Sequence, residues 1–399
     1  MKRKLIIISS ITLLVILSIV GIITLNNKRK IKEAIIVISY IENREVDFLS
    51  KVKVSDFIER INGKIVDDYE IDTTVIGDKN VEFEYINDDN IKIKQDFTIN
   101  VVDRVAPTIW LSGSYSVNVG SDINLQNKIL CADNYDDEPK CVIEGDYNLN
   151  KKGSYPLTYK AVDSSGNETI KEFKLNVVEP SKGGSTSIAK TNFSDIVKNY
   201  KNENTEIGLD ISKWQGDVDF EKLREAGVEF VILRVGSANG IDKDRYIDSK
   251  FEQNITRANA AGIPVGIYYY SYAHTKQRAI EDALWVVEKI KDYKVDLPIA
   301  FDWENWSSYN NYHLSFYHLT EMAKSYLDVF KESGYEGMLY SSKTYLENMW
   351  MDTGYPVWLA HYTSKTNYEG KYIYWQMCNN GRVSGINGDV DIDIRYINK

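Results

Sequence analysis

Residues 297–304, which read Leu-Pro-Ile-Ala-Phe-Asp-Trp-Glu, combine the pattern of a core strand with two acids at its end. The apolar run is typical of a strand that is buried on both faces. Residues two positions apart in a strand point to the same face, so Asp302 and Glu304 are expected to project together while Trp303 points the other way. An α/β barrel keeps its chemistry at this end of its strands. The alternative is a strand that runs into a solvated acidic turn.

The chain around this stretch alternates strands with helices from Ile207 onward, a pattern typical of parallel βα units. Long amphipathic helices are expected at 276–290 and at 316–333, where Gly334 ends the second one. Five helices are expected in all, because the last three strands follow one another too closely for helices. The eight expected strands cover residues 207–212, 230–235, 264–271, 297–304, 336–342, 357–362, 372–378 and 389–397. Residues 206–399 are therefore predicted to form an irregular, TIM-like α/β barrel of five helices and eight strands, whose final quarter is antiparallel or hairpin-like.

Two further acids lie on the first and last of these expected strands. Asp210 lies near the end of the first strand, and Asp391 near the start of the last one. If the strands close into a barrel, these two strands are neighbours, and their acids can meet Asp302 and Glu304 above the lumen. Converging carboxylates repel one another and raise one another's pKa values, which costs stability unless they serve a purpose. The convergence favours a catalytic site, although each acid alone would more often be a cap or turn residue.

The segment 206–399 resembles the family-25 glycoside hydrolases, the muramidases of the Chalaropsis type. Residues 208–216 read Gly-Leu-Asp-Ile-Ser-Lys-Trp-Gln-Gly and resemble the family's opening motif GxDxSxWQG, while residues 302–304 carry its D-x-E. Two departures, Tyr269-Tyr270 in place of His-Phe and Asp393 in place of Asn, put the details of the subsites in doubt. The resemblance implies an irregular β/α barrel that hydrolyses the β-1,4 bond between N-acetylmuramic acid and N-acetylglucosamine in peptidoglycan, with no cofactor.

The resemblance also implies roles for the acids. Glu304 is the general acid/base, and Asp302 is the ionised carboxylate that stabilises positive charge near C1 and whose repulsion raises the pKa of Glu304. The family favours attack by the substrate's own 2-acetamido group, oriented by Asp210 and Asp391, while a covalent route stays open. The expected lining of the substrate groove is Trp214, Arg234, Tyr268, Trp358, Tyr362 and Trp375. The alternatives are a place in the core for each aromatic ring and a structural ion pair with one of the acids for Arg234.

Residues 33–179 contain an internal repeat. An offset of 76 residues separates Gly77 from Gly153 and also Phe97 from Phe173. A constant period of this size indicates two copies of one domain, and the short alternating strands fit a small β-sandwich of immunoglobulin type. We expect one such domain at 33–103 and a second at 104–179; the second copy resembles bacterial immunoglobulin-like modules at residues 106–109, 132–137 and 159–167. Both are interpreted as spacers or as weak adhesion modules.

An acidic loop in the second copy is flanked by two cysteines. A disulfide between Cys131 and Cys141 is expected outside the cytoplasm, where it would contribute about 2–3 kcal/mol. The acids of this loop lack the spacing of an EF-hand, so an exposed acidic turn is favoured over a calcium site, and no metal site is predicted. The acids concerned are Asp133, Asp136, Asp137 and Glu138.

The N-terminal segment predicts a membrane anchor. The basic residues 2–4 precede residues 5–25, which carry no charge and are long enough to span a bilayer as a helix. We expect residues 1–4 to form a cytoplasmic tip and residues 5–25 an uncleaved transmembrane helix that holds the catalytic domain outside, facing the cell wall. The alternative is a cleaved signal peptide and a secreted protein. Residues 180–205, which open with Pro, Gly and Ser, are expected to be a linker.

The composition limits the partners. A net charge of −10, without a basic run beyond the N-terminal region, excludes nucleic acid as the expected partner. The 28 Tyr and 8 Trp residues supply flat rings that suit the faces of sugars. The expected partners are the glycan strands of peptidoglycan and, through the N-terminal helix, the membrane. The alternatives are a hydrolase of chitin or a related polymer, and a non-catalytic, wall-binding surface protein or adhesin that uses the repeats.

Overall fold

The computed structural model describes residue 29, residues 36–180 and residues 189–397, and the chain divides after Arg104 into two compact units. The predicted membrane anchor at residues 5–25 lies outside the described residues. In the part of the chain that the structure describes, no helix has both the length and the apolar character needed to cross a membrane. The transmembrane helix of the predicted fold class is therefore not found there.

The first unit is built around the long hairpin of β7 (Gly77–Asn87) and β8 (Lys92–Val102). β2 (Glu45–Asp47) pairs in parallel with β8, and β5 (Gly63–Ile65) pairs antiparallel with β7. Alternate residues of the hairpin are buried, so one face of this sheet covers an apolar core. The other elements are β1 (Ile38–Tyr40) with β4 (Ile58–Ile61), β3 (Val52–Lys53) with β6 (Glu70–Ile71), and the 3₁₀ helix η1 (Val54–Phe57).

Residues 105–179, hereafter the β domain, repeat this arrangement inside the second unit. Their hairpin consists of β13 (Gly153–Val162) and β14 (Glu168–Val178), flanked by β10 (Ser114–Asn118) in parallel and by β12 (Lys140–Glu144) in antiparallel pairing. The strand order β10-β14-β13-β12 is equivalent to the order β2-β8-β7-β5 of the first unit. The pairing register repeats as well, since Ile65 faces Tyr85 where Cys141 faces Ala161.

The predicted immunoglobulin-type sandwiches are not found among the described strands. Such a domain packs two sheets that hold about seven strands. Each copy here has a single four-stranded sheet, and its remaining strands form two-stranded sheets, such as β9 (Thr108–Ile109) with β11 (Cys131–Ala132). In the β domain, the short helix α2 (Leu125–Lys128) and the acidic loop occupy the chain between β10 and β12, where a second sheet would need longer strands.

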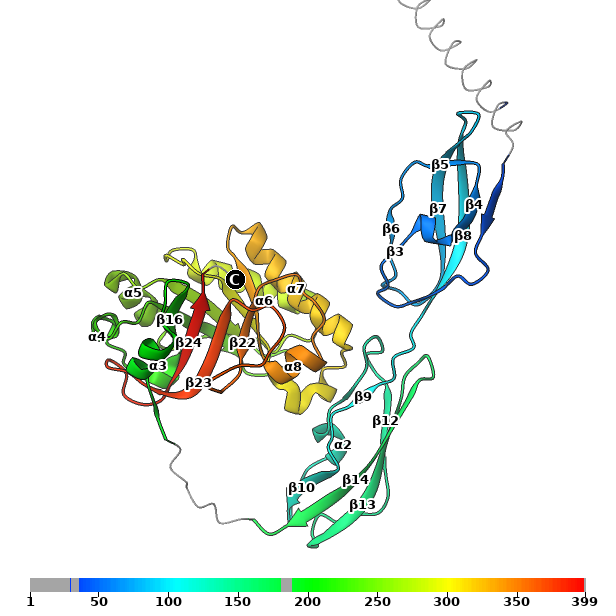
Figure 1. Cartoon of the computed structure of the whole chain (residues 1–399). Coiled ribbons are helices and arrows are strands. Elements are labelled where there is room, and N and C mark those ends of the chain that lie inside the picture. The colour runs from blue at the N-terminus through cyan, green and yellow to red at the C-terminus, as the bar shows by residue number, and fades with distance from the viewer. Residues whose placement is uncertain (1–28, 30–35, 181–188, 398–399) are drawn as a thin grey trace, which may run out of the picture. The chain divides into compact units, whose positions relative to one another are not determined.

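The rest of the second unit forms a closed barrel of eight strands (Figure 1). Seven strands run in parallel, and the last one pairs antiparallel with both of its neighbours and closes the barrel. In chain order the strands are β16 (Thr205–Ile211), β17 (Phe230–Ala238), β19 (Val265–Tyr270), β20 (Ile299–Asp302), β21 (Gly337–Ser342), β22 (Val357–Ala360), β23 (Tyr374–Arg382) and β24 (Val390–Tyr396). Two short strands extend the sheet: β15 (Thr191–Asn192) pairs with β23, and β18 (Arg245–Ile247) pairs with β17.

The predicted TIM-like barrel of five helices is wrong. Within residues 189–397 eight helical segments occur, and several are too short to show an amphipathic period in the sequence. All strands of a TIM barrel are parallel, whereas β24 is antiparallel to both of its neighbours, which confirms the antiparallel final quarter expected from the sequence. The helices are α3 (Phe193–Tyr200), η2 (Lys213–Gln215), α4 (Phe220–Glu225), α5 (Phe251–Ala261), α6 (Lys276–Ile290), η3 (Asn305–Asn311), α7 (Phe316–Glu332) and α8 (Lys343–Asn348).

The barrel has an inner and an outer apolar layer. The inner layer fills the lumen with side chains such as Phe230, Met338 and Tyr374. The outer layer lies between the strands and the helices that cover them. At Gly208, on β16, a Cβ atom would lie 2.5 Å from the carbonyl oxygen of Phe230 and 2.6 Å from its ring. Close packing in the lumen therefore requires glycine at this position.

Gly208→Ala is expected to destabilise the second unit, because the added methyl group has no space beside Phe230. Overpacking of a closed core costs about 1–3 kcal/mol. Urea denaturation followed by tryptophan fluorescence measures this unit, which contains all 8 Trp residues of the chain. Gly113→Ala is the matched control, because no atom lies within 4 Å of its added Cβ. Equal stability of the two variants would contradict the packing described.

Candidate active site

The pairing register carries one set of side chains around the inside of the barrel. Asp210 lies opposite Ile232, Arg234 opposite Tyr268, and Tyr270 opposite Asp302. Alternate residues of a barrel strand point to the interior, so the side chains in this set share the lumen. The set continues through Tyr340, Trp358, Gln376 and Asp393 and returns to Asp210 by way of Asp391. Three of the four predicted acids therefore lie on one face of the closed sheet.

Asp302 and Glu304 form a hydrogen-bonded pair of carboxyl groups. β20 ends at Asp302, and Glu304 directly precedes η3 with φ −125° and ψ 18°, so it does not lie in the strand as predicted. Asp302 is only 3% exposed, whereas Glu304 is exposed. Trp303 is buried and donates its indole N–H to the carbonyl oxygen of Ala273 at 3.1 Å. The pair therefore presents one carboxyl group at the surface and holds the other beneath it.

The pKa values of both carboxyl groups are raised. Burial raises the pKa of Asp302 well above its usual range, and the charges of Glu304 and Asp210 raise it further. Burial also raises the pKa of Glu304, but its hydrogen bond with Asp302 acts in the opposite direction. The shift at Glu304 thus comes from burial and not from the predicted repulsion by Asp302. In the free protein the pair holds one proton in preference to two charges, and burial favours that proton on Asp302.

Gln376 joins the other two acids. Asp210 and Asp391 lie opposite each other in the register of β16 and β24, and the Gln376 Nε2 atom lies 3.3 Å from an oxygen of each. The Oε1 atom of Gln376 accepts hydrogen bonds from Tyr340 Oη at 2.9 Å and from Tyr362 Oη at 3.1 Å. Since Gln376 is only 1% exposed, its amide connects both acids and both tyrosines from within the barrel.

The acids near Gln376 also have raised pKa values. Burial raises the pKa of Asp210 well above its usual range, with further contributions from the charges of Asp391 and Asp393. Burial, together with the charges of Glu304 and Asp389, raises the pKa of Asp391 to about 7. Asp393 is fully buried and accepts a hydrogen bond from Trp358 Nε1 at 2.8 Å. Burial and mutual repulsion therefore disfavour the charged forms of these acids.

The predicted aromatic lining divides into exposed and buried rings. Trp214, on η2, is 76% exposed, and Tyr362, two residues beyond β22, is 53% exposed, so both can contact a ligand. Tyr268 lies in the inner layer, where burial and the charge of Asp210 raise the pKa of its hydroxyl group. Trp358 is buried in the same layer, and Trp375 lies in the outer layer, where its Nε1 atom donates to the carbonyl oxygen of His361 at 2.9 Å. The structure thus brings Trp214 and Tyr362 to the surface but neither Trp358 nor Trp375.

Arg234 forms an ion pair with an acid that the sequence did not single out. Its Nε and Nη2 atoms lie 2.7 Å and 2.6 Å from Asp248 Oδ2, and Asp248 is buried. Asp248 also accepts the backbone N–H groups of Lys213 at 3.1 Å and of Lys250 at 2.9 Å. The positive charge of Arg234 still lowers the pKa values of Asp210 and Asp302, against the larger effect of burial. Arg234 is therefore a buried counter-charge held in place by Asp248.

Sequence reasoning missed Gln376, Tyr340 and Asp248 as site residues. Gln376 and Tyr340 occupy inward positions on β23 and β21, which an alternation count along each of these strands would have suggested. Asp248 precedes α5 without a motif, and its partner Arg234 lies fourteen residues away on another element. No local signal identifies it.

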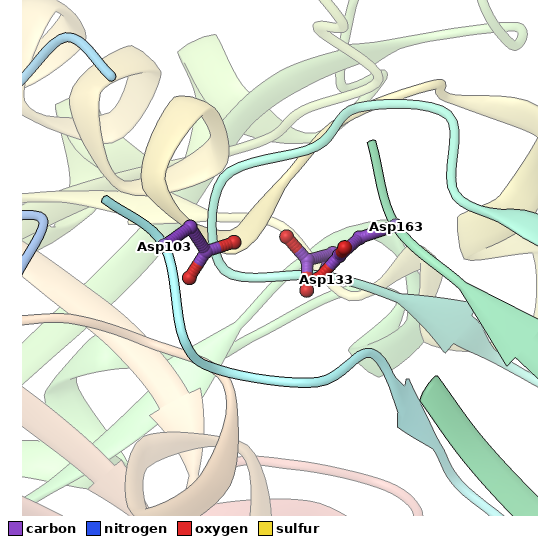
Figure 2. A group of neighbouring side chains, drawn as sticks. All are labelled: Asp103, Asp133 and Asp163. Atoms are coloured by element: carbon purple, nitrogen blue, oxygen red, sulfur yellow. The ribbon is translucent and has the colours of Figure 1, made fainter. Parts of the chain in front are cut away.

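A second group of acids lies in the β domain. Figure 2 shows Asp133 and Asp163, drawn with Asp103 of the first unit. Asp133 accepts the N–H groups of Tyr135 at 2.9 Å and Asp136 at 2.8 Å, and Asp163 accepts the N–H group of Asn167 at 2.8 Å. These carboxylates thus stabilise turns. Of the loop acids weighed as a calcium set, Asp133 alone belongs to this group, since Asp136 accepts Ser164 N–H while Asp137 and Glu138 contact histidines of the barrel.

Comparison with known proteins assigns the barrel to a family. Residues 209–386 match the sequence model of glycosyl hydrolases family 25, so the chain carries a domain of that family. It is 27% identical over 189 residues to "Autolytic lysozyme" of Clostridium acetobutylicum, which is 47% of this chain and 54% of that protein. It is 26% identical over 202 residues to "Lysozyme M1" of Streptomyces globisporus, which is 46% of this chain and 65% of that protein. The chain thus spans about half the length of the first of these curated relatives.

Solved structures are also similar to part of the chain. A family 25 glycosyl hydrolase from Bacillus anthracis aligns with a TM-score of 0.43 and 19% identity, over 54% of this chain and 96% of that one.

The Asp391→Asn variant is expected to lose less stability than the wild type as the pH rises from about 4 to about 7. A carboxyl group whose pKa rises from 3.8 to about 7 on folding binds more protons in the folded state. Its contribution is therefore full below pH 3.8 and is lost as the pH rises through about 7. Asparagine has no proton to lose, so at pH 8 the variant should exceed the wild type by about 1 kcal/mol or more.

Urea denaturation at pH 4, 6 and 8 measures this difference. Asp292→Asn, at an exposed aspartate beyond α6, is the control and should follow the wild-type curve. An Asp391→Asn variant that loses as much stability as the wild type between pH 4 and pH 8 would contradict the assignment.

Proposed function

We propose that the family 25 domain is an N-acetylmuramidase, which hydrolyses the β-1,4 bond between N-acetylmuramic acid and N-acetylglucosamine in peptidoglycan. The observation that carries this proposal is the exposed Glu304 hydrogen-bonded to the buried Asp302 at the end of a barrel strand. Glycosidases divide their work between a carboxylic acid and an ionised carboxylate that flank the scissile bond. The lysozyme names of the two curated relatives support the choice of substrate.

Glu304 acts as the general acid because it is the member of the pair that a substrate can reach. Burial raises its pKa and so favours the protonated form, from which it gives its proton to the glycosidic oxygen as the C1–O bond breaks. The positive charge that develops at C1 favours the ionised form of Asp302, and the shared proton of the pair then lies on Glu304. Glu304, once deprotonated, accepts a proton from the water that attacks C1 in the second step.

Asp210 and Asp391 orient the 2-acetamido group of the substrate in this proposal. The carbonyl oxygen of that group attacks C1, and a carboxyl group that accepts the amide N–H directs it. Gln376 holds the two acids together, which fixes the direction of the acceptor oxygens. The exposed rings of Trp214 and Tyr362 offer flat faces to the sugar rings.

The proposal includes a location of the protein outside the cytoplasm. The disulfide between Cys131 and Cys141 supports it, because such bonds persist in oxidising compartments. Peptidoglycan is reached from that side of the membrane, so the domain would act on the cell wall.

Glu304→Gln is expected to lower the rate of peptidoglycan cleavage by about 10²- to 10⁴-fold, because the amide cannot donate the acid's proton. The melting temperature should not fall, since the change removes a carboxyl group whose pKa is raised. The assay is the clearing of purified cell walls, with mass spectrometry to identify the new reducing ends. Glu369→Gln, at an exposed glutamate between β22 and β23, is the control and should retain full activity.

Three outcomes would contradict the proposed function. Lysis retained by Glu304→Gln would remove Glu304 from the reaction. New reducing ends at N-acetylglucosamine, or cleavage of soluble chitin oligomers in preference to peptidoglycan, would indicate another amino-sugar hydrolase. Wall binding without any cleavage by the wild type would favour the non-catalytic, wall-binding alternative.

A further inference from the structure

The N-terminus of α7 is capped by the β domain. The first N–H groups of a helix have no partners within the helix and need acceptors from elsewhere. Phe316 N–H donates to the carbonyl oxygen of Asp133 at 2.9 Å, and Tyr317 N–H donates to that of Asn134 at 3.1 Å. Only the third N–H group is satisfied locally, by Ser315 Oγ at 3.2 Å from His318 N. The start of this barrel helix therefore depends on backbone groups about 180 residues earlier in the chain.

Asp137 adds a charge to the same cap. Its Oδ1 atom accepts the N–H group of Ser315 at 2.6 Å, and its two oxygens lie 2.7 Å and 2.8 Å from His318 Nδ1. Although burial acts against it, hydrogen bonds from His318 and Ser315 lower the pKa of Asp137. A negative charge at the N-terminus of a helix interacts favourably with the helix dipole. The carboxylate is thus charged where the helix requires it.

Asn310 attaches the segment before α7 to the β domain. Its Nδ2 atom donates to the carbonyl oxygens of Gln126 at 2.8 Å and Ile129 at 3.0 Å, while its Oδ1 atom accepts the N–H group of Cys131 at 3.0 Å. The side-chain amide of asparagine can donate two hydrogen bonds and accept others. The Asn310 side chain thus makes three hydrogen bonds to the backbone of residues 126–131 in the β domain. These bonds fix the position of Asn310.

Apolar packing accompanies these hydrogen bonds. Leu130 and Ala132, at 6% and 2% exposure, belong to the outer apolar layer of the barrel although they lie in the β domain. Cys131 lies between them and forms the disulfide with Cys141. The disulfide therefore closes the loop that carries Asp133, Asn134 and Asp137 to the barrel.

The segment between Glu304 and α7 transmits this attachment to the acid pair. Trp306 follows Glu304 by two residues and stacks on Tyr345, with ring centroids 4.1 Å apart. The ring of Trp303 lies 5.0 Å from that of Trp306, 5.7 Å from that of Tyr309 and 4.9 Å from that of Tyr312. Asn310 directly follows Tyr309 in this cluster. The segment is thus held by β20 at one end, by α7 at the other and by the β domain between them.

We propose that the β domain is a structural part of the catalytic half, and that it positions Glu304 by holding residues 305–318, with Asn310 and Asp137 as positioning residues. The catalytic part of this proposal rests on the proposed function. The first copy of the repeat lacks the means to act in this way, since Phe57 and Ile61 stand where the offset places Asp133 and Asp137. Under this proposal the second copy has a role beyond that of the spacer or weak adhesion module expected from the sequence.

Asn310→Ala and Asp137→Ala, made in the full chain, test the proposal by hydrogen exchange and kinetics. Amide exchange in residues 305–318 should become faster in both variants, while exchange in β16 and β24 stays unchanged. The kcat on peptidoglycan should fall by about 10-fold or more with KM within about twofold, because a misplaced acid slows chemistry more than binding. Asp137→Glu should recover part of the loss, since it keeps the carboxylate.

Asn311→Ala is the matched control, an exposed asparagine next to Asn310, and should behave as the wild type in both measurements. Unchanged exchange in residues 305–318 of Asn310→Ala and Asp137→Ala would overturn the attachment. Faster exchange with unchanged kcat would overturn the positioning of Glu304. If the wild type cleaves no peptidoglycan, the proposed function fails by itself, and the exchange data still decide whether the β domain holds the segment.

Discussion

β24 pairs with β16 on one side and with β23 on the other, and this double antiparallel pairing closes the barrel. A sheet without this strand would leave two edges with unpaired backbone groups. The closure also fixes the register, so that Asp391 lies opposite Asp210 and Asp393 lies opposite Gly208. The strands approach so closely that added Cβ atoms at Gly208 and Gly381 would lie 2.5 Å and 2.6 Å from carbonyl oxygens. Asp210 and Asp391 therefore lie side by side because of the pairing register of β16 and β24.

The buried acids in the lumen reduce the stability that the closed barrel gains from its strand pairing. Asp210, Asp302 and Asp393 have pKa values raised by burial, and Asp391 titrates near pH 7. Each such group stabilises the fold less as the pH rises. The counter-charge of Arg234 and the amide of Gln376 offset part of this cost without neutralising the site. Carboxyl groups whose charged form is disfavoured in the free protein are suited to exchange protons with a substrate.

The sequence predicted those features that follow from local period and order. Strand alternation placed Asp302 on an inward face, and the order of strands placed Asp210 beside Asp391. The sequence did not predict which aromatic side chains face the lumen, because the same residue type occurs in both layers. Trp358 lies in the inner layer, whereas Trp375 lies in the outer layer. The position of Glu304 also escaped it, because the strand ends two residues earlier. Short helices such as η3 lack a period, and the contact between Asn310 and Cys131 joins residues 179 positions apart.

The β domain shows how one hairpin scaffold supports a more specific role. A backbone carbonyl can cap a helix only if its own chain segment is rigid, because a mobile acceptor gains little from one hydrogen bond. The loop that presents the carbonyls of Asp133 and Asn134 is closed by the Cys131–Cys141 disulfide. Within it the carboxylate of Asp133 accepts two backbone N–H groups of the same loop. The carboxylate of Asp133 therefore shapes the loop, and the loop in turn holds the N-terminus of α7.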